Sequence, residues 1–278
     1  MSDFQAIVLG FLQGFSEWLP VSSTAHVAVG LRLFGLSDAG GLGAAFTAVS
    51  QLGSVLAALI YFRKDIRSVL ARPAADGDAP SAPADQPDRR LLLPVVIGSL
   101  PVVVCGVVFK HAIEGPLRGM YVVAASMMSF ALILAWTESR ATLRRKLASV
   151  TIWDGLLIGI GQMFSLIPGA SRSGTTITAA LATGLERATA ARFSFLLSLP
   201  AVTGAGLYEL AKHRHDIVAA NMARPLLLAT AMAFVVGYAS IDFLLRFLRR
   251  HPTYVFVVYR VVVGAIILTL IALGNLTP

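Results

Sequence analysis

Charged residues are scarce in this chain. Only 14% of its 278 residues are Asp, Glu, Lys or Arg, whereas soluble domains carry about 25%, and 56% of the residues are hydrophobic. This composition excludes an ordinary soluble domain and indicates a protein embedded in a membrane. The 23 basic residues outnumber the 15 acidic ones. Because they lie between apolar runs, we expect them to face anionic lipid headgroups, and we expect no nucleic acid partner.

Cysteine is nearly absent, since Cys105 is the single one in the chain. The fold therefore cannot depend on an internal disulfide. Aspartate-rich clusters and the Cys/His spacing of zinc sites are also missing. A metal ion that acts here must use few protein ligands, as Mg²⁺ does when phosphate oxygens supply the remaining ones.

Long apolar segments dominate the rest of the sequence. Six of them are uncharged, or nearly so, and approach the roughly 20 residues that a membrane-spanning helix needs. We expect spanning helices at residues 42–62, 91–109, 120–137, 193–208, 225–241 and 252–276.

Two further apolar stretches, 4–34 and 153–185, are broken in the middle by proline, glycine and hydroxyl residues. Such residues are poor helix interior. We expect two re-entrant helical hairpins, each entering the membrane and turning back; a pair of short interfacial helices at each break is the alternative. Non-helical backbone at membrane depth is tolerated only beside protein or a watery cavity, so each break is a candidate site.

The distribution of basic residues predicts the orientation. If the long hydrophilic loop 63–90 is cytoplasmic, the cytoplasmic segments hold 15 Lys and Arg residues and the outer segments 6, which follows the positive-inside rule. Both termini then face outward. The Pro- and Ala-rich centre of that loop, 73–88, is typical of disorder. The cytoplasmic segments of this topology are 63–90, 139–150, 185–192 and 246–251, and the outer ones are 31–41, 110–119 and 210–224.

In this topology the two hairpins enter from opposite faces. The halves 1–137 and 151–278 also resemble each other weakly: aligning Pro20 with Pro168 places Ser23 on Ser171, and Phe46-Thr47 then lies near Phe193-Ser194. We therefore predict one all-α polytopic membrane domain, residues 1–278, with six transmembrane helices and two re-entrant hairpins in an inverted-topology repeat. In such folds the broken helices meet near the bilayer middle and form the site.

The first break carries reactive groups. Gln13 and Glu17 are four residues apart and share a helix face, while Ser23 and His26 follow within one turn of the next helix. Ionisable groups inside a membrane are expensive and by default suggest function. The structural alternative is that hydroxyls such as Ser22 only cap the second helix, but capping does not explain Glu17 and His26.

The second break, residues 168–176, has the composition of an anion cradle. Its glycines allow a close approach of backbone N–H groups, its hydroxyls add donors, and Arg172 supplies a fork suited to phosphate oxygens. The following helix directs its N-terminus at the same anion. The alternative is a polar kink in which Arg172 pairs with Glu17, a costly use of a buried arginine. The candidate phosphate-binding residues are Ser171, Arg172, Ser173, Gly174 and Thr176.

At these two motifs the sequence resembles the undecaprenyl-diphosphate phosphatase, or bacitracin-resistance, family. The first signature is a Glu/Gln-x-x-x-Glu segment that runs into Leu-Pro-Val-Ser-Ser-x-x-His, and the second is Pro-Gly-x-Ser-Arg-Ser-Gly-x-Thr. Both occur here in order, and Gln51-Leu52-Gly53-Ser54 also resembles the family.

The resemblance implies a multi-pass protein of the bacterial inner membrane that hydrolyses undecaprenyl diphosphate to the monophosphate and inorganic phosphate. This reaction recycles the lipid carrier of cell-wall synthesis, with the site open to the periplasmic side. The resemblance also implies a divalent cation, Mg²⁺ or alternatively Ca²⁺. The implied roles are Glu17 as metal ligand or water-positioning residue with Gln13 beside it, Ser23 as nucleophile, and His26 as acid or base.

One departure affects the metal site. Many members carry Glu where Gln13 stands, so this chain has one sure carboxylate there. Two mechanisms stay open: attack by Ser23 with His26 as base, or attack by a metal-bound water. The rival class is a polyprenyl-phosphate transporter or flippase, because broken helices and inverted repeats are common in transporters.

Arg260 is the other intramembrane charge, and it is also a candidate site residue, expected to snorkel or to pair with a carboxylate such as Asp242. The sequence leaves the oligomeric state open and is compatible with a homodimer.

Overall fold

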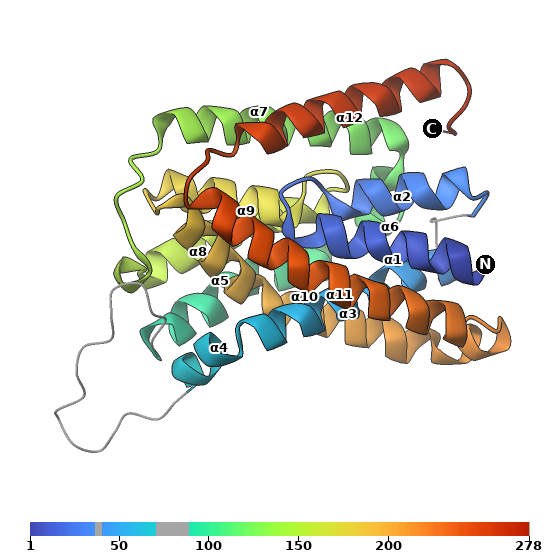
Figure 1. Ribbon diagram of the computed structural model, residues 1–278, viewed down its shortest axis with the longest axis horizontal. Coiled ribbons are helices and arrows are strands. Elements are labelled where there is room, and N and C mark those ends of the chain that lie inside the picture. The colour runs from blue at the N-terminus through green and yellow to red at the C-terminus, as the bar shows by residue number, and fades with distance from the viewer. Residues whose placement is uncertain (37–40, 71–88, 278) are drawn as a thin grey trace.

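The computed structural model describes residues 1–36, 41–70 and 89–277, and within them every regular element is a helix, apart from one isolated bridge between Arg145 and Leu185. The helices run mostly along the long axis, and both chain ends lie at the same end of the molecule (Figure 1).

Four of the described helices are long and apolar enough to cross a membrane. Two bent pairs raise the number to six if each pair is one span, α3 with α4 at 70° and α5 with α6 at 78°. The prediction of an all-helical, multi-pass membrane protein is confirmed. The four helices are α7 (Met120–Arg140), α10 (Arg187–Ala219), α11 (Ala223–Leu248) and α12 (Tyr254–Ala272), and the pairs comprise α3 (Gly41–Tyr61), α4 (Arg63–Leu70), α5 (Leu92–Val108) and α6 (Lys110–Glu114).

Both predicted breaks separate helices. The first lies between α1 (Asp3–Trp18) and α2 (Ser23–Leu33), and the second between α8 (Ile152–Met163) and α9 (Arg172–Ala182), with the short 3₁₀ helix η4 (Phe164–Leu166) after α8. Figure 1 shows the hairpins entering from opposite ends of the molecule. Their tips touch, because the Ser173 hydroxyl donates to the Leu19 carbonyl over 2.8 Å.

The two hairpin tips have the same local geometry. Ser22 and Ser171 both adopt a positive φ, 75° and 69°, and each side chain accepts a hydrogen bond from the N–H group three residues further on. Matching the two caps aligns Ser22 with Ser171. The alignment of Pro20 with Pro168 paired Ser23 with Ser171, so the two alignments differ by one position. The second loop holds one more residue between proline and cap, and it includes Gly169 at φ 93°.

Glycines bring the entry arm of each hairpin into backbone contact with a neighbouring helix. A Cβ on Gly10 would lie 2.3 Å from the Ala229 oxygen of α11, and one on Gly159 would lie 2.2 Å from the Gly98 oxygen of α5. Gly14 and Gly155 make equivalent contacts with α11 and α5. Small residues at such crossings are typical of helix packing in membranes. Each arm is thus anchored by two glycines four residues apart: Gly10 and Gly14 in α1, Gly155 and Gly159 in α8.

Helix α10 is longer than the predicted span 193–208. It begins at Arg187 and ends at Ala219, because the flanking segments are rich in Ala, Arg, Leu and Lys, which favour helix. The segments 185–192 and 210–224, expected as loops, are therefore largely helical. Residues 63–70 of the expected loop 63–90 form α4, whereas the predicted disorder at 73–88 lies outside the described residues.

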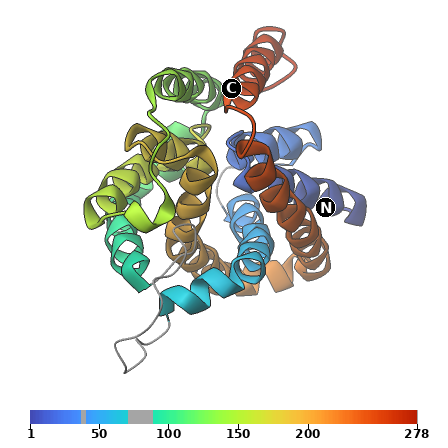
Figure 2. The ribbon, with the colours of Figure 1, turned by 60° about the vertical axis from the view of Figure 1, so that its left-hand side comes forward.

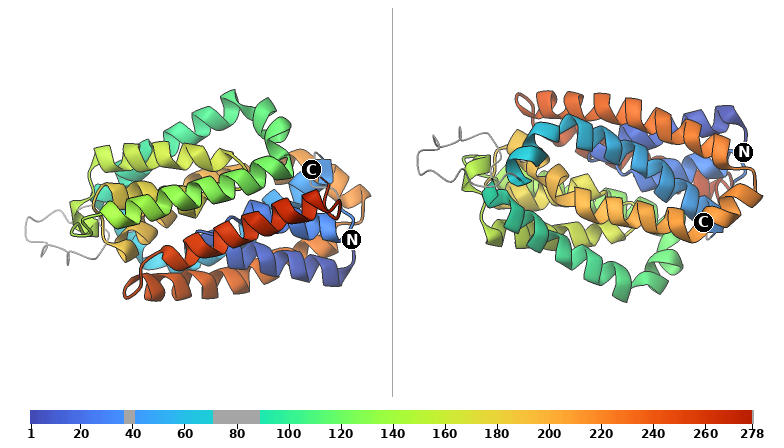
Figure 3. Two further views of the ribbon diagram at one scale, coloured as in Figure 1. Left: turned by 90° about the horizontal axis from the view of Figure 1, so that it is seen from above. Right: turned by 90° about the horizontal axis from the view of Figure 1, so that it is seen from below.

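An ion pair closes the base of the second hairpin. Arg145 donates to both Asp154 oxygens, over 2.8 and 2.6 Å, and to the Thr183 carbonyl over 2.9 Å, which joins the start of α8 to the end of α9. The hydrogen bond to Asp154 raises the pKa of the Arg145 guanidinium above its ordinary value. Helices α7 and α12 pack together over the hairpins, as Figures 2 and 3 show from two directions.

We expect Gly159→Ala to lower the melting temperature in detergent, because the new methyl group would clash with the Gly98 backbone. Gly204→Ala is the matched control: nothing lies within 4 Å of a Cβ on Gly204, and Gly-to-Ala changes in an unobstructed helix stabilise by about 0.5–1 kcal/mol. Equal melting temperatures for the two variants would contradict the close contact of α8 with α5.

Candidate active site

A cavity of about 240 Å³ lies where the two hairpins meet α3, α5 and α10. Glu17 and Ser23 reach it from the first hairpin, and Ser171 and Arg172 from the second. Apolar side chains line it as well: Val102, Leu166, Ala201, Val202 and Ala205. Four of the residues proposed from the two motifs are therefore neighbours in space, although about 150 residues separate the two motifs in the sequence.

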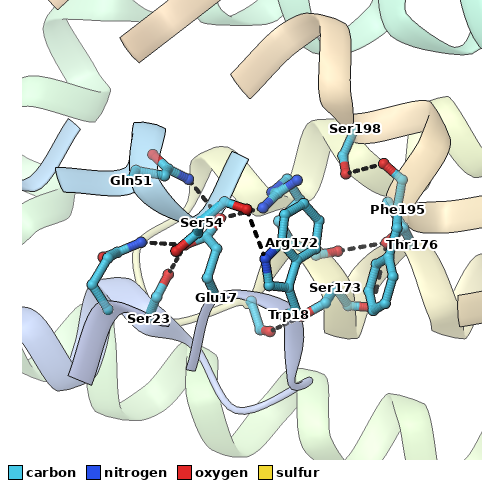
Figure 4. Close-up of polar contacts among 12 residues, drawn as sticks. Glu17, Trp18, Ser23, Gln51, Ser54, Arg172, Ser173, Thr176, Phe195 and Ser198 are labelled. Carbon is cyan, nitrogen blue, oxygen red and sulfur yellow. Dashed lines mark hydrogen bonds and ion pairs between the residues drawn. The ribbon is translucent and has the colours of Figure 1, made fainter. Parts of the chain in front are cut away.

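Glu17 lies at the centre of the polar contacts in the cavity. Its side chain is 2% exposed and accepts hydrogen bonds from Gln13 Nε2, Ser23 Oγ and Gln51 Nε2, each over 2.6 Å. Arg172 adds an ion pair through Nη2. Figure 4 shows Ser23, Gln51 and Arg172 converging on the carboxylate from three segments of the chain. A buried carboxylate is expensive unless it is paired and hydrogen-bonded, and four donors meet that requirement.

Arg172 begins α9 and is held on a second side by an aromatic ring. Its guanidinium carbon lies 5.1 Å from the centre of the Trp18 ring, within the range of a cation–π interaction. Trp18 is fixed in turn, because its Nε1 donates to the Ser54 carbonyl over 3.2 Å and its ring packs edge-on against Phe195. The guanidinium fork is therefore oriented, with 13% of the side chain exposed.

The other residues of the second motif face the protein. Ser173 donates to the Leu19 carbonyl, and the Thr176 hydroxyl donates to the Arg172 carbonyl over 2.8 Å. The N–H group of Gly174 donates to the capping Ser171 hydroxyl over 3.2 Å. None of Ser173, Gly174 and Thr176 is among the residues that line the cavity. We interpret these three as residues that position the loop carrying Arg172.

His26 lies away from Ser23, in contrast to the expectation that the two act together. Its Nδ1 lies 2.7 Å from the Ser22 carbonyl and its Nε2 2.7 Å from the Tyr259 hydroxyl, with the two rings stacked. A carbonyl can only accept, so Nδ1 carries the proton, and neutral His26 accepts at Nε2 from Tyr259. His26 is not among the lining residues of the cavity.

Arg260 contacts the second loop and not Asp242. It is fully buried, and its Nη2 donates to the carbonyls of Gly169 and Ala170 over 3.2 and 2.8 Å. Asp242 instead accepts from Tyr61 and pairs with Arg246, one helical turn away. The expected pairing and the snorkelling alternative are therefore wrong. Arg260 binds the backbone of the loop that precedes Arg172, and its guanidinium lies against that loop.

Three contributors have weak signals in the sequence. Gln51 stands out only within a stretch that resembles the family, Gln162 is one polar residue in a largely apolar segment, and Tyr259 has no signal beyond its place before Arg260. In the structure Gln51 donates a hydrogen bond to Glu17, Tyr259 is hydrogen-bonded to His26, and Gln162 lines the cavity.

Oxygen donors suited to a hard cation lie next to Glu17. Gln13 Oε1 is buried and has no hydrogen-bond partner among the described residues, although Gln13 Nε2 binds Glu17. No three His, Cys, Asp or Glu side chains are grouped to hold a metal anywhere in the described part of the chain, this site included. The donor set of Glu17 and Gln13 thus fits a divalent cation whose remaining ligands come from phosphate or water.

Comparison with known proteins agrees with the geometry. The family described as bacitracin resistance protein BacA matches residues 6–266. An undecaprenyl-diphosphatase of Myxococcus xanthus is 49% identical over 278 residues, which covers this whole chain and 92% of the relative. The undecaprenyl-diphosphatases of Chlorobium chlorochromatii and Chlorobaculum tepidum are 45% and 44% identical, over the full length of both chains in each case. The chain belongs to the BacA bacitracin-resistance family.

Proposed function

We propose that this protein hydrolyses undecaprenyl diphosphate to undecaprenyl phosphate and inorganic phosphate. The reaction returns the lipid carrier to cell-wall synthesis, and the family name links it to bacitracin resistance. The observation that carries the proposal is the convergence of Glu17, Ser23 and Arg172 on one cavity, in a family whose relatives are named undecaprenyl-diphosphatase.

Arg172 provides the charge that the reaction requires. Phosphoryl transfer depends chiefly on positioning and on neutralising negative charge. In the structure the guanidinium is paired with Glu17. We infer that the diphosphate competes for this cation, which leaves the carboxylate free to accept a proton. The contact between Arg172 and the Trp18 ring does not require substrate. It therefore keeps the guanidinium in place while the diphosphate replaces Glu17 as its partner.

Glu17 is the base that the geometry supports. The Ser23 hydroxyl already donates to Glu17 Oε2 over 2.6 Å, whereas His26 is engaged with Ser22 and Tyr259. We propose that Ser23 Oγ attacks the terminal phosphorus as Glu17 takes its proton, so that the bond from this phosphorus to the bridging oxygen breaks and undecaprenyl phosphate leaves. Water then hydrolyses the phosphoserine, which regenerates Ser23 and yields inorganic phosphate. Direct attack by a water activated by Glu17 is the alternative route.

A divalent cation is part of the proposal, and Mg²⁺ suits the oxygen donors, with Ca²⁺ as the second choice. Glu17 and Gln13 would hold it, and the substrate phosphates would complete its ligands. When bound, the cation would neutralise charge on the phosphate oxygens. Gln13 brings no charge of its own, so we expect the cation to bind more weakly here than in members with Glu at this position.

We also propose an inverted-topology repeat whose site opens to the periplasmic side of the inner membrane. A second cavity shares Thr24 and Gln51 with the first and reaches Arg118, in the segment predicted to lie outside. At the opposite end, Lys64, Arg192 and Arg249 line one cavity of about 580 Å³, which gathers segments predicted to be cytoplasmic. Both observations support the orientation given by the positive-inside rule.

Purified protein in detergent is expected to release phosphate from a polyprenyl diphosphate in the presence of Mg²⁺ and to stop when EDTA is added. A transporter or flippase needs two compartments, so the absence of phosphate release would favour that class.

Gln13→Glu should lower the Mg²⁺ concentration needed for half-maximal activity, because it adds a carboxylate ligand. An unchanged Mg²⁺ requirement in this variant would argue against Gln13 as a ligand.

Arg172→Ala is expected to reduce kcat/KM by about 10²–10³-fold, the usual effect of removing a donor that stabilises developing charge. Arg172→Lys should retain part of the activity, because the charge remains while the fork is lost. Melting temperatures in detergent separate this effect from unfolding caused by the unpaired Glu17. An active Arg172→Ala protein would remove Arg172 from the phosphate site.

Ser23→Ala distinguishes the two routes. Loss of the nucleophile should abolish turnover by several orders of magnitude, whereas loss of one hydrogen bond to Glu17 would cost only about tenfold. Ser16→Ala is the matched control, because Ser16 is a buried serine of the same hairpin whose hydroxyl bonds only its own helix at Leu12. Near-wild-type turnover of Ser23→Ala would exclude the covalent route.

A further inference from the structure

Gln162 is a buried amide at the cavity with neither end satisfied. It is 0% exposed, and neither Oε1 nor Nε2 has a hydrogen-bond partner within the described residues. An unsatisfied buried amide is costly, and native proteins rarely keep one without a reason. Gln162 lines the same cavity as Glu17 and Arg172, so a ligand in that cavity is the partner the amide lacks.

The repeat places Gln162 where Glu17 stands in the other half. Glu17 follows Gly14 by three residues, and Gln162 follows Gly159 by three. Gly14 and Gly159 are corresponding anchors, since each belongs to a pair spaced by four and packs on the backbone of a neighbouring helix. The same local geometry therefore aims both side chains at the junction of the hairpins. One half supplies a carboxylate and the other a neutral amide.

The surroundings of Gln162 suggest which part of the substrate it meets. Leu166, one helical turn further along the same hairpin, lines the cavity with Val102 and Val202. We infer that the polyprenyl chain leaves past these apolar residues, which places the phosphate attached to it near Gln162. Glu17 and Ser23 come from the opposite hairpin and face the terminal phosphate in the proposed reaction.

We propose that the Gln162 amide donates a hydrogen bond to the lipid-linked phosphate, the one retained in the product. This inference rests on the proposed function. Gln162 is then a binding residue that sets the register of the diphosphate, so that its terminal phosphorus lies at Ser23. A neutral amide suits this position, because a second carboxylate would repel the substrate.

The test compares wild type with Gln162→Met, which keeps the length of the side chain and removes the amide. Farnesyl diphosphate serves as substrate, and farnesyl phosphate and inorganic phosphate serve as the two product inhibitors. We expect KM and the inhibition constant of farnesyl phosphate to rise about 10- to 100-fold, the effect of losing a hydrogen bond to a charged group. Inhibition by inorganic phosphate should not change.

Thermal stabilisation by farnesyl phosphate provides a readout that does not depend on turnover, and it should be weaker in Gln162→Met. Gln162→Glu, of the same size, should raise KM further through repulsion. Ser194→Ala is the matched control: it also removes a buried polar atom that has no partner in the described part of the chain, away from the cavity lining. Its KM and inhibition constants should match those of wild type.

Two outcomes would overturn the inference. One is unchanged KM and farnesyl phosphate binding in Gln162→Met, as expected if the amide only binds a structural water. The other is a lower kcat with unchanged binding of farnesyl phosphate, which would assign Gln162 to the transferred phosphate. Failure of the proposed function would be seen in the wild type itself, as an absence of phosphate release, and is therefore distinguishable.

Discussion

The ion pair between Glu17 and Arg172 joins two hairpins that enter the protein from opposite ends. Buried ion pairs seldom add stability compared with a well-packed apolar pair, because both charges lose their hydration. Here the cost is reduced by Gln13, Ser23 and Gln51 on the carboxylate and by Trp18 beneath the guanidinium. The neighbouring residues therefore stabilise the pair, with three donors to the carboxylate and an aromatic ring against the guanidinium.

The broken helices supply what an unbroken membrane helix could not. In a continuous helix the backbone N–H and carbonyl groups bond to each other, so none is free for an anion or for a second loop. The breaks free such groups, and the structure shows where they are satisfied: Leu19 accepts from Ser173, and Gly169 and Ala170 accept from Arg260. The site and the contact between the hairpins therefore have a common origin in the two loops.

The two hairpins carry different side chains at positions that have the same local geometry. At the hairpin caps Ser22 matches Ser171, so that the following residues, Ser23 and Arg172, are a hydroxyl on one side and a cation on the other. Glu17 and Gln162 are each the next-to-last residue of the entry helix of their hairpin. A strictly symmetric site would place like charges against each other, whereas here a carboxylate, a hydroxyl, a cation and a neutral amide line one cavity.

The sequence alone determined the membrane class and both breaks, and it identified Glu17, Ser23 and Arg172 as candidate site residues, because charge is so expensive in an apolar segment that each polar residue there stands out. It could not determine which polar groups meet. The sequence placed Ser23 and His26 three residues apart and left open whether His26 acts on Ser23. In the structure Ser23 bonds Glu17, while His26 bonds Tyr259, 233 residues away. Spacing along a helix identifies shared faces but not the neighbour across the bundle. The contact of Arg260 with the second loop was likewise decided by tertiary packing. The length of α10 reflects helix propensity in its flanking segments, which a search for apolar segments does not detect.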